Sequence, residues 1–598
     1  MIKNGSPPSS AVDALATVTS KLSVHPGFAL PHQPAPLGRW NDERILTWLV
    51  LAFLAVICLL PIARLLYEVA SALVGPQRGM VVSAVTSSAA WTATRHSLEV
   101  GLLGGLVATV YGLFMATLVT LTKIRYRQML VFGFVAQAML PAQVVALAWL
   151  QLWMPMRDAL VSMGLQSASA WGNPLQTREG IVFLLGIHFA PLVFLTVRAA
   201  LLNVPPDVVE AARVCGARPT QVIRKVIWPL ITPAFASGAA LAFVSCIGNF
   251  GIPAFLGIPG DYLVLPTLIY RELSGFGPSV IPNVVMLSVL VAVLAGLGVV
   301  AQHLCIRRGH YRVVTVRYPE PPFSLGASRV WLELFTGCLI ALLLIVPMLA
   351  LLADSISQAP GVSVTPDTAT LAHYVYVLSG NEATARAFVN STVLAFGAAF
   401  ILAAVSLFLA YLIQYRQNSL FIKLERVIEI PYVIPGVVLA MAMILLYLLP
   451  LPFLNVSLYN TLGIIFIAYL ARFLTVQLRP VISGFQQFPT EMLEAAEIFG
   501  ASFRRRMRQI VLPSLLPSIT AGATLVVLLA MNELTISALL WATGTETLGV
   551  AVFSLEQGGE SAAASAIGVL TVLITVSLML LASLAGRRLP SGVLPWRA

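Results

Sequence analysis

Long apolar segments alternate with short polar ones along most of the chain, and this pattern predicts a polytopic membrane protein. A helix needs about 20 mainly apolar residues to cross a bilayer. Segments of that length fall into two groups of six, near 45–67, 97–122, 129–155, 179–198, 229–257 and 282–305, and near 331–353, 391–414, 427–450, 460–478, 513–541 and 562–586. We therefore expect an all-α fold of about 12 transmembrane helices.

Basic residues predict the orientation of these helices. Lys and Arg are concentrated in alternate loops, near 123–127, 213–225, 307–317, 416–426, 504–508 and 587–588. Basic loops stay on the cytoplasmic side, so both chain termini are expected there. The net charge of +11 is then mostly a matter of topology. It gives no reason to expect a nucleic-acid partner, and the expected surroundings are membrane lipid.

The composition agrees with this class of protein. The chain has 598 residues, of which 58% are hydrophobic and only 10% charged, whereas a soluble domain carries about a quarter charged residues. Five cysteines show neither CxxC nor CxxH spacing. We interpret them as small apolar residues, so the sequence predicts no certain metal site and no disulfide framework.

The two halves of the chain are related in sequence. Residues 94–118 parallel 388–412, and the stretches 139–150 and 432–443 are alike, with Pro141 aligned with Pro435 at an offset of 294 residues. Six crossings return a chain to the side where it began, so the halves enter the membrane in the same direction and form a parallel repeat. The loop at 156–178 is shortened in the second copy.

This repeat predicts the domain organisation. The expected units are a flexible cytoplasmic tail, a first transmembrane lobe with its core at about 90–305, a cytoplasmic connector, a second lobe with its core at about 385–588, and a short cytoplasmic tail. Their expected bounds are 1–44, 45–305, 306–328, 329–588 and 589–598.

One charged phrase occurs in both halves, before the fifth apolar segment of each. It reads "VVEAARVCGARPTQVIRKVIWPLITPA" at 208–234 and "MLEAAEIFGASFRRRMRQIVLPSLLPSI" at 492–519. In the first copy we predict a helix with Asp207 as N-cap and Glu210 in a capping box. Gly216 and Gly500 suit a bend between two short helices. The phrases could be simple surface linkers, but their repetition at matching cytoplasmic positions favours a docking role.

The phrase resembles the EAA loop of ABC-importer permeases, which reads Glu-Ala-Ala, three residues, Gly, nine residues, Ile, one residue, Leu-Pro. The second copy matches throughout, whereas the first has Val226 and Trp228 in place of Ile and Leu. The positions that match in both copies are Glu210, Ala211, Ala212 and Gly216, and Glu494, Ala495, Ala496 and Gly500. The chain thus resembles a fused, two-lobe permease of the binding-protein-dependent type, most like ferric-iron importer permeases.

The resemblance implies the partners and the mechanism. Each phrase would be a coupling helix seated on a cytoplasmic ABC ATPase, present in two copies, and a periplasmic or lipid-anchored solute-binding protein would deliver the cargo at a bacterial cytoplasmic membrane. The chain has no GxxxxGK[ST] loop, so ATP and Mg²⁺ would bind to the ATPase. The chain itself would bind no cofactor and catalyse no reaction.

Polar side chains inside apolar segments are costly and are candidates for the translocation pathway. They are Gln143, Asn249, Asn532, Glu533 and Thr535. Glu533 lies at the position that matches Asn249, and either residue could instead make a hydrogen bond between helices. For His188, in the fourth segment, such a structural hydrogen bond is the favoured interpretation. Glu99 lies near a segment end.

The cargo is less determined than the class. The stretch "NFGIPAFLG…YLVLPTLIYRELSGFG" looks most like ferric-iron permeases, and carboxylate and amide oxygens suit a hard cation such as Fe³⁺. Related fused permeases carry thiamine or aminoethylphosphonate, and a carboxylate could equally meet an amine. An ion-coupled secondary transporter would need no ATPase and leaves the two phrases without a role. A membrane enzyme is disfavoured because the chain has neither HExxH nor GxSxG.

Overall fold

The computed structural model describes residues 41–74, 79, 86–307, 321–359, 361–362, 364–450 and 455–585. Most of the expected tails, residues 1–40 and 589–598, lie outside this part of the chain, as do residues 308–320 of the expected connector. Residues 41–44, which we assigned to the first tail, instead form the first turn of α2. Across the described residues the chain is helical, and β-structure is limited to two isolated bridges.

The helices repeat in the same order in the two halves. In the first half they are α2 (Asn41–Leu54), α3 (Leu60–Val74), α5 (Ser88–Leu121), α6 (Arg127–Met139), α7 (Ala142–Ser162), α8 (Arg178–Leu202), α9 (Pro206–Val214), α10 (Pro219–Val222), α11 (Trp228–Gly248), α12 (Gly251–Leu256), α13 (Leu265–Leu273) and α14 (Val280–Arg307). In the second they are α15 (Ser328–Ile340), α16 (Val346–Ile356), α17 (Ala372–Val375), α18 (Glu382–Ala410), α19 (Ser419–Val433), α20 (Gly436–Tyr447), α21 (Leu462–Gln486), α22 (Glu491–Ile498), α23 (Phe503–Arg506), α24 (Leu512–Met531), α25 (Ser537–Leu540), α26 (Leu548–Gln557) and α27 (Ser561–Ala585).

Among the described helices, 11 are long and apolar enough to cross a membrane, or 12 if the bent pair α19–α20 counts as one span. The expected all-α polytopic fold is therefore confirmed. Four expected segments are nevertheless not straight helices. The chain breaks at Leu140–Pro141 within 129–155 and at Ile434–Pro435 within 427–450, because proline disfavours helical geometry in the residue before it. Segments 229–257 and 513–541 end as helices at Gly248 and Met531.

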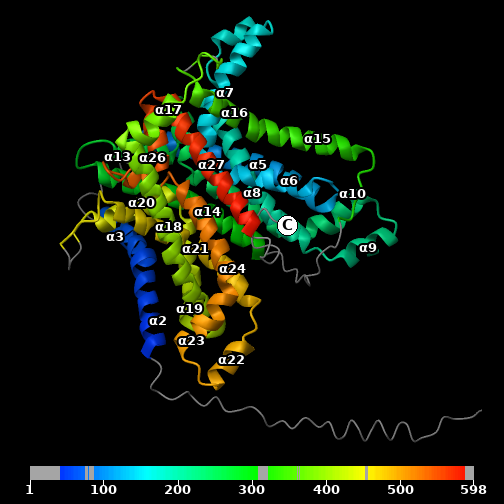
Figure 1. Cartoon of the computed structure of the whole chain (residues 1–598), viewed down its shortest axis with the longest axis vertical. Helices are drawn as coiled ribbons and strands as arrows, with labels where there is room; N and C mark the ends of the chain where they lie inside the picture. Colours follow the sequence, from blue (N-terminus) through cyan, green and yellow to red (C-terminus); the bar gives the residue numbers. More distant parts are fainter. Residues whose placement is uncertain are drawn as a thin grey trace, which may run out of the picture.

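The first span of each half packs against the opposite half. Helix α3 contacts α20, and Arg64 Nε donates to the Leu445 carbonyl at 3.3 Å. Helix α16 contacts α7, and α15 contacts α6. In Figure 1, α2 runs beside α19 and α23, while α15 extends over α6 toward α10. We call α2–α3 and α15–α16 the crossing helices.

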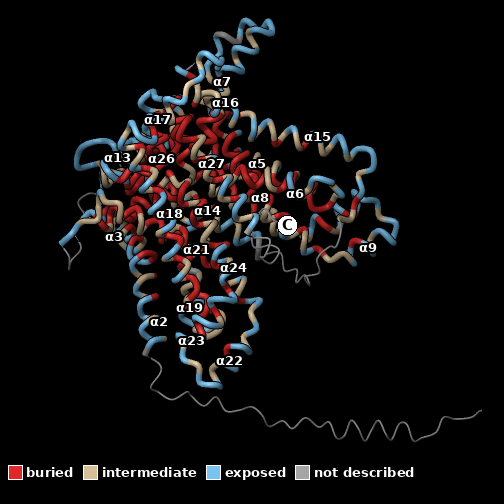
Figure 2. Tube along the Cα trace, viewed as in Figure 1, coloured by how far each residue is buried: buried red, intermediate tan, exposed pale blue. Residues whose placement is uncertain are grey.

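The buried core is continuous between the two halves. Phe553 of α26 lies 5.8, 5.6 and 5.5 Å, centroid to centroid, from the rings of Phe250, Phe255 and Tyr270 in the first half. Figure 2 shows buried residues gathered in the centre, whereas α2 and α22 are more exposed. Small residues bring helices together within each half. A Cβ at Gly112 of α5 would lie 2.5 Å from the Ala190 carbonyl of α8, a packing typical of membrane helices.

Candidate coupling and translocation sites

The two charged phrases form matching short helices, α9 and α22, on one side of the molecule, with α13 and α26 on the other (Figure 1). Gly216 and Gly500 have φ of +80° and +76°, a conformation that glycine adopts without steric cost. The chain turns there into α10 and α23, so the predicted bend is confirmed. The predicted capping box is wrong, because Pro205 is the N-cap of α9 and makes no side-chain cap.

Helices α9 and α22 are each anchored on one face and present apolar side chains on the other. Val209 and Leu493 occupy matching positions and are buried. Beyond them, Val214 is 88%, Ile498 79% and Phe499 89% exposed. Exposed apolar side chains that cluster on a protein surface commonly mark an interaction site.

The motif residues surround these exposed tips. Glu210, Ala211, Glu494 and Ala495 are exposed, and Ala212 and Ala496 are half-buried. The apolar residues beside them were not among the predicted site residues. The available signal was the apolar pair that precedes the glycine in both phrases, "VC" and "IF".

Charged side chains of the second half bind Glu497 and hold α22 in place. Glu497 pairs with Arg506 at 2.8 Å and with Arg416 at 3.4 Å, and it accepts a hydrogen bond from Tyr415 at 3.0 Å. Partial burial opposes ionisation, but the bonds and positive charges of these partners outweigh it and hold the pKa of Glu497 below its ordinary value. Glu497 is therefore a carboxylate at neutral pH.

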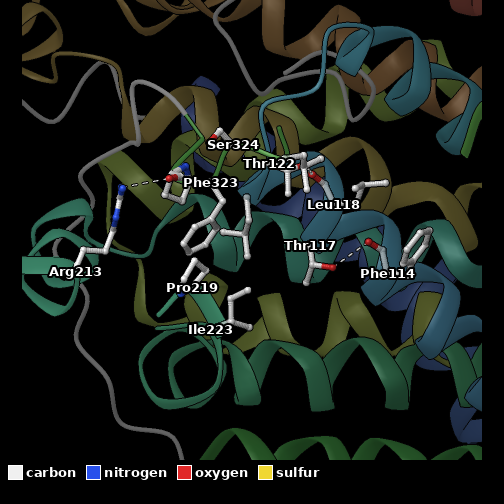
Figure 3. A pocket seen from close by; sticks show the side chains of 12 residues that line it. Phe114, Thr117, Leu118, Thr122, Arg213, Pro219, Ile223, Phe323 and Ser324 are labelled. Carbon is white, nitrogen blue, oxygen red and sulfur yellow. Dashed lines mark hydrogen bonds between the residues drawn. The ribbon is translucent and has the colours of Figure 1, made fainter. Parts of the chain in front are cut away.

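In the described part of the chain, helix α9 is held by hydrogen bonds to and within the segment at 322–325 rather than by ion pairs. Arg213 Nη1 donates to the Pro322 carbonyl at 3.4 Å, and Phe323 pairs through its backbone with Leu121 and Lys123. These groups border a pocket of about 430 Å³ between α5, α10 and the segment at 322–325. Figure 3 shows Arg213 directed across the mouth of this pocket toward that segment.

Two of the pathway candidates meet where the halves join. Gln143 Nε2 of α7 donates to the Asn532 carbonyl at 3.2 Å, and Asn532 Nδ2 donates to the Met139 carbonyl at 2.9 Å. Thr535 packs within the second half, where a Cβ at Gly436 would lie 3.0 Å from its Cγ2. The structure thus brings Gln143 and Asn532 together across the junction, with Thr535 close along the chain.

Glu533 and Asn249 both cap the short helix that follows them. The Glu533 carboxylate accepts hydrogen bonds from the backbone N–H of Ile536 at 2.8 and 3.0 Å and of Ser537 at 3.1 Å. Asn249 Oδ1 accepts from Ile252 N–H at 2.9 Å. The two residues match in the repeat and perform the same local task, within their own segment rather than between helices. Their part in the translocation pathway stays a prediction.

Arg472, on α21, is an intramembrane charge that our sequence analysis missed. Its Nη1 donates to the carbonyls of Tyr432, at 2.9 Å, of Pro431, at 3.3 Å, and of Ile434. These carbonyls lie in the last turn of α19 and at the break that follows it. The last carbonyls of a helix have no hydrogen-bond partner within the helix. The signal was a lone arginine in the apolar segment 460–478.

His188 occupies the position of Arg472 in the first half. It is buried on α8, which contacts α6, and its Nδ1 has no hydrogen-bond partner among the residues that the structure describes. The structural hydrogen bond favoured for His188 therefore stays a prediction.

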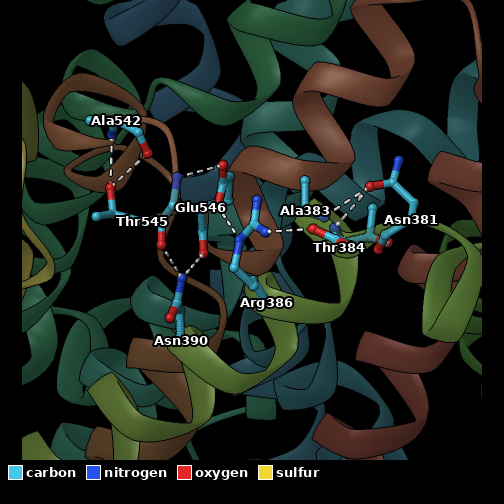
Figure 4. Close-up of polar contacts among 10 residues, drawn as sticks. Asn381, Ala383, Thr384, Arg386, Asn390, Ala542, Thr545 and Glu546 are labelled. Carbon is cyan, nitrogen blue, oxygen red and sulfur yellow. Dashed lines mark hydrogen bonds and ion pairs between the residues drawn. The ribbon is translucent and has the colours of Figure 1, made fainter.

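The outer ends of the halves are also fastened in matching ways. Asn390 Nδ2 donates to the carbonyls of Gly544 and Glu546 at 3.2 and 2.9 Å, and Arg386 lies 3.6 Å from the Glu546 carboxylate (Figure 4). In the first half, Glu99 pairs with Arg95 at 2.8 Å and accepts from Tyr262. These contacts hold the segments before α26 and α13 against α18 and α5.

The comparison with known families decides the class. The family described as binding-protein-dependent transport system inner membrane component matches residues 108–305 and 404–593. The chain belongs to this family. Because the family's domain occurs twice, the chain is a fused permease, as the repeat predicted. It is a multi-pass membrane protein of the ABC-importer class, a class of transport proteins.

Relatives of this permease carry several different names. The y4fN protein of Sinorhizobium fredii, described as an ABC transporter permease, is 27% identical over 531 residues, 86% of this chain and 90% of that protein. The Fe(3+)-transport system permease FbpB 2 of Haemophilus influenzae is 23% identical and covers 66% of this chain and 74% of its own. A sulfate transport permease, cysT of Nephroselmis olivacea, is 28% identical over 42% of this chain and 89% of its own.

A solved structure of a bacterial ABC transporter that imports alginate is also similar. It is 16% identical, covers 44% of this permease and 96% of its own chain, and has a TM-score of 0.35.

Proposed function

We propose that this permease is the membrane channel of an ATP-driven importer, and that α9 and α22 receive the force of two ABC ATPase copies. The observation that carries the proposal is the pair of matching helices on one side of the molecule, each with exposed apolar tips. Closure of the ATPases would move α9 and α22 together and alternate access to a path between the lobes. ATP and Mg²⁺ would bind to the ATPases.

Charge reversal on the coupling helices tests this role. The double variant Glu210→Arg and Glu494→Arg should lose co-purification with the ATPase while remaining inserted in the membrane. A matched control reverses two exposed acids outside both coupling helices, Asp158→Arg in α7 and Glu382→Arg at the start of α18, and should keep the ATPase bound. Unchanged co-purification of the first variant would contradict the coupling role.

The proposed orientation places both termini and both coupling helices in the cytoplasm of a bacterium, with the permease in its inner membrane. A periplasmic or lipid-anchored binding protein would deliver solute to the other face, as the family's description supports. Cys215 is exposed at the end of α9. In a variant with this single cysteine, a membrane-impermeant maleimide should label inverted vesicles and spare intact spheroplasts, and the reverse result would overturn the orientation.

For the cargo we propose ferric iron, supported by the relatives named for ferric transport. Because backbone N–H groups already bind the Glu533 carboxylate, most of the selectivity would come from the binding protein. Deletion of the permease should abolish ATP-dependent uptake of radiolabelled ferric iron, and Glu533→Ala should reduce it.

An oxyanion is the second candidate, supported by relatives named for sulfate and for 2-aminoethylphosphonate transport. The deletion strain distinguishes the two. Normal iron uptake with loss of sulfate or 2-aminoethylphosphonate uptake would replace the iron proposal.

A further inference from the structure

A chain of charged side chains joins α2, the first helix of the permease, to the coupling helix of the opposite lobe. Arg416 donates to both carboxylate oxygens of Glu43, from Nε at 2.7 Å and from Nη2 at 2.9 Å. Arg416 Nη2 also reaches Glu497 of α22 at 3.4 Å, and Glu497 pairs with Arg506 at 2.8 Å. A bidentate arginine–carboxylate pair fixes the relative orientation of the two side chains as well as the distance between them.

These charged side chains are partly shielded from water, which strengthens the ion pairs between them. The side chain of Arg506 is 5% exposed, that of Glu43 17%, and those of Arg416 and Glu497 about a third. Shielded pairs interact more strongly than pairs in open water. The neighbouring pair of Asp42 with Arg504, at 2.9 Å, is mostly exposed and contributes little.

The link matters to α22 because that helix has few other attachments. It spans only eight residues, and Leu493 is its single buried side chain. One buried leucine can hold the helix near the lobe, but it leaves the helix free to rotate about that point. The carboxylate of Glu497 supplies a second attachment, and two points define an orientation.

The first coupling helix has no corresponding ionic link among the described residues. The positions of Glu497 and Arg506 are occupied there by Arg213 and Val222, 284 residues earlier. Glu333 of α15 is an acid on the other crossing helix, although the position that matches Glu43 is Arg329, 286 residues later. Glu333 accepts hydrogen bonds from Arg125 and Arg329, both of which lie outside α9.

We propose that Glu43, Arg416 and Glu497 are positioning residues that make α22 move with α2. The proposal rests on the proposed function and deepens it. An ATPase that pulls on α22 pulls through this link on α2, which continues into α3 and its contact with α14 of the first half. Force applied to the second coupling helix therefore reaches both halves, whereas α9 acts on its own lobe and the 322–325 segment. Within the part of the chain that the structure describes, the two coupling helices are therefore unequal.

Hydrogen exchange on the full-length permease in lipid nanodiscs tests the link without any partner. In Glu43→Gln, amide exchange across 491–500 should rise roughly fivefold, the effect of losing about one partly shielded ion pair. Exchange across 206–216 should stay unchanged. The double variant Glu43→Gln/Glu497→Gln should exchange no faster than the faster single variant, because both changes break one link. Glu333→Gln is the matched control and should leave 491–500 as it was.

The permease–ATPase complex gives the functional readout. Glu43→Gln should retain the ATPase yet change its basal ATP turnover about fivefold, and Glu333→Gln should not. Unaltered exchange at 491–500 in Glu43→Gln, or additive effects in the double variant, would overturn the link. If no ATPase co-purifies with the unaltered permease, the proposed function fails, while the exchange measurement still decides whether the link exists.

Discussion

The side-chain amide of Gln143 in the first lobe donates to the backbone carbonyl of Asn532 in the second, and the amide of Asn532 donates back to the carbonyl of Met139. This reciprocal pair lies where α6 gives way to α7 and where α24 ends. A motion that parts the lobes at this point must break both hydrogen bonds. The pair therefore holds the junction in the arrangement seen in the structure.

Removing one member should loosen the junction. We expect Gln143→Ala to lower the free energy of unfolding by about 1 kcal/mol and to raise the basal ATP turnover of the permease–ATPase complex. Gln302→Ala is the control, because Gln302 bonds Ser237 within the first lobe. It should cost similar stability and leave turnover unchanged. Equal turnover in the two variants would show that the Gln143 bond does not restrain the lobes.

Substitutions at Glu533 should separate a helix cap from a cargo contact. Glu533→Ala leaves the N–H groups of Ile536 and Ser537 without an acceptor, so the free energy of unfolding should fall by about 1–3 kcal/mol. Glu533→Gln keeps one acceptor oxygen, as Asn249 does in the other lobe, and should lose less than half of that. Thermal unfolding in nanodiscs measures both. If Glu533→Gln were as stable as the unaltered chain yet lost all uptake, the carboxylate would have to contact the cargo.

Arg472 should be among the most sensitive positions in the second lobe. Arg472→Leu strands the carbonyls at the α19 break and should cost roughly 3 kcal/mol of unfolding free energy. Arg472→His, which introduces the residue found at the matching position 188, should restore part of this. Arg479→Leu on the same helix removes an exposed pair with Glu429 and should cost little. Similar losses for the two leucine variants would refute the capping role.

The bend after each coupling helix should depend on glycine. Gly216→Ala and Gly500→Ala force an L-residue into positive φ and should each cost about 1 kcal/mol, although a Cβ at Gly216 meets no atom within 4 Å. ATPase co-purification should weaken with them, because α9 or α22 would tilt. Gly296→Ala is a fair comparison, since that site is equally open but helical. It should be neutral or slightly stabilising.

The ion pairs of Glu497 should make stability depend on pH in a defined window. The pKa of Glu497 lies below its ordinary value of 4.5, so the pairs contribute fully above that pH and are lost as the pH falls through the lowered value. The gap in unfolding temperature between the unaltered chain and Glu497→Gln should be largest at neutral pH and close in acid. A gap that stayed constant down to pH 3 would contradict the assignment.

Much of the architecture follows from the sequence because it rests on periodic or repeated features. The apolar segments and the glycine bends are visible in single stretches of the chain, and the repeat is visible when the two halves are compared. Pro141 and Pro435 were also visible, yet the sequence analysis drew straight segments through them, because apolar content alone does not register a missing N–H. The stops at Gly248 and Met531 were hidden because no proline stands at either one and apolar residues continue beyond both.

The roles of the polar residues were harder to predict because they depend on direction. Glu533 and Asn249 looked like pathway groups by residue type, but their oxygens point to the backbone of the next turn. Arg472 was passed over although it is charged, since its purpose appears only once the end of α19 is placed beside α21. The packing of α3 and α16 on the opposite lobes has no local signature at all.

That exchange of first spans has a topological consequence. Cutting the polypeptide between α14 and α15 would break a covalent bond without separating the lobes. Each lobe has a helix packed against the other, α3 against α20 and α16 against α7. Two separately translated halves would keep these same packing surfaces, so the connector itself would not be needed to hold them together.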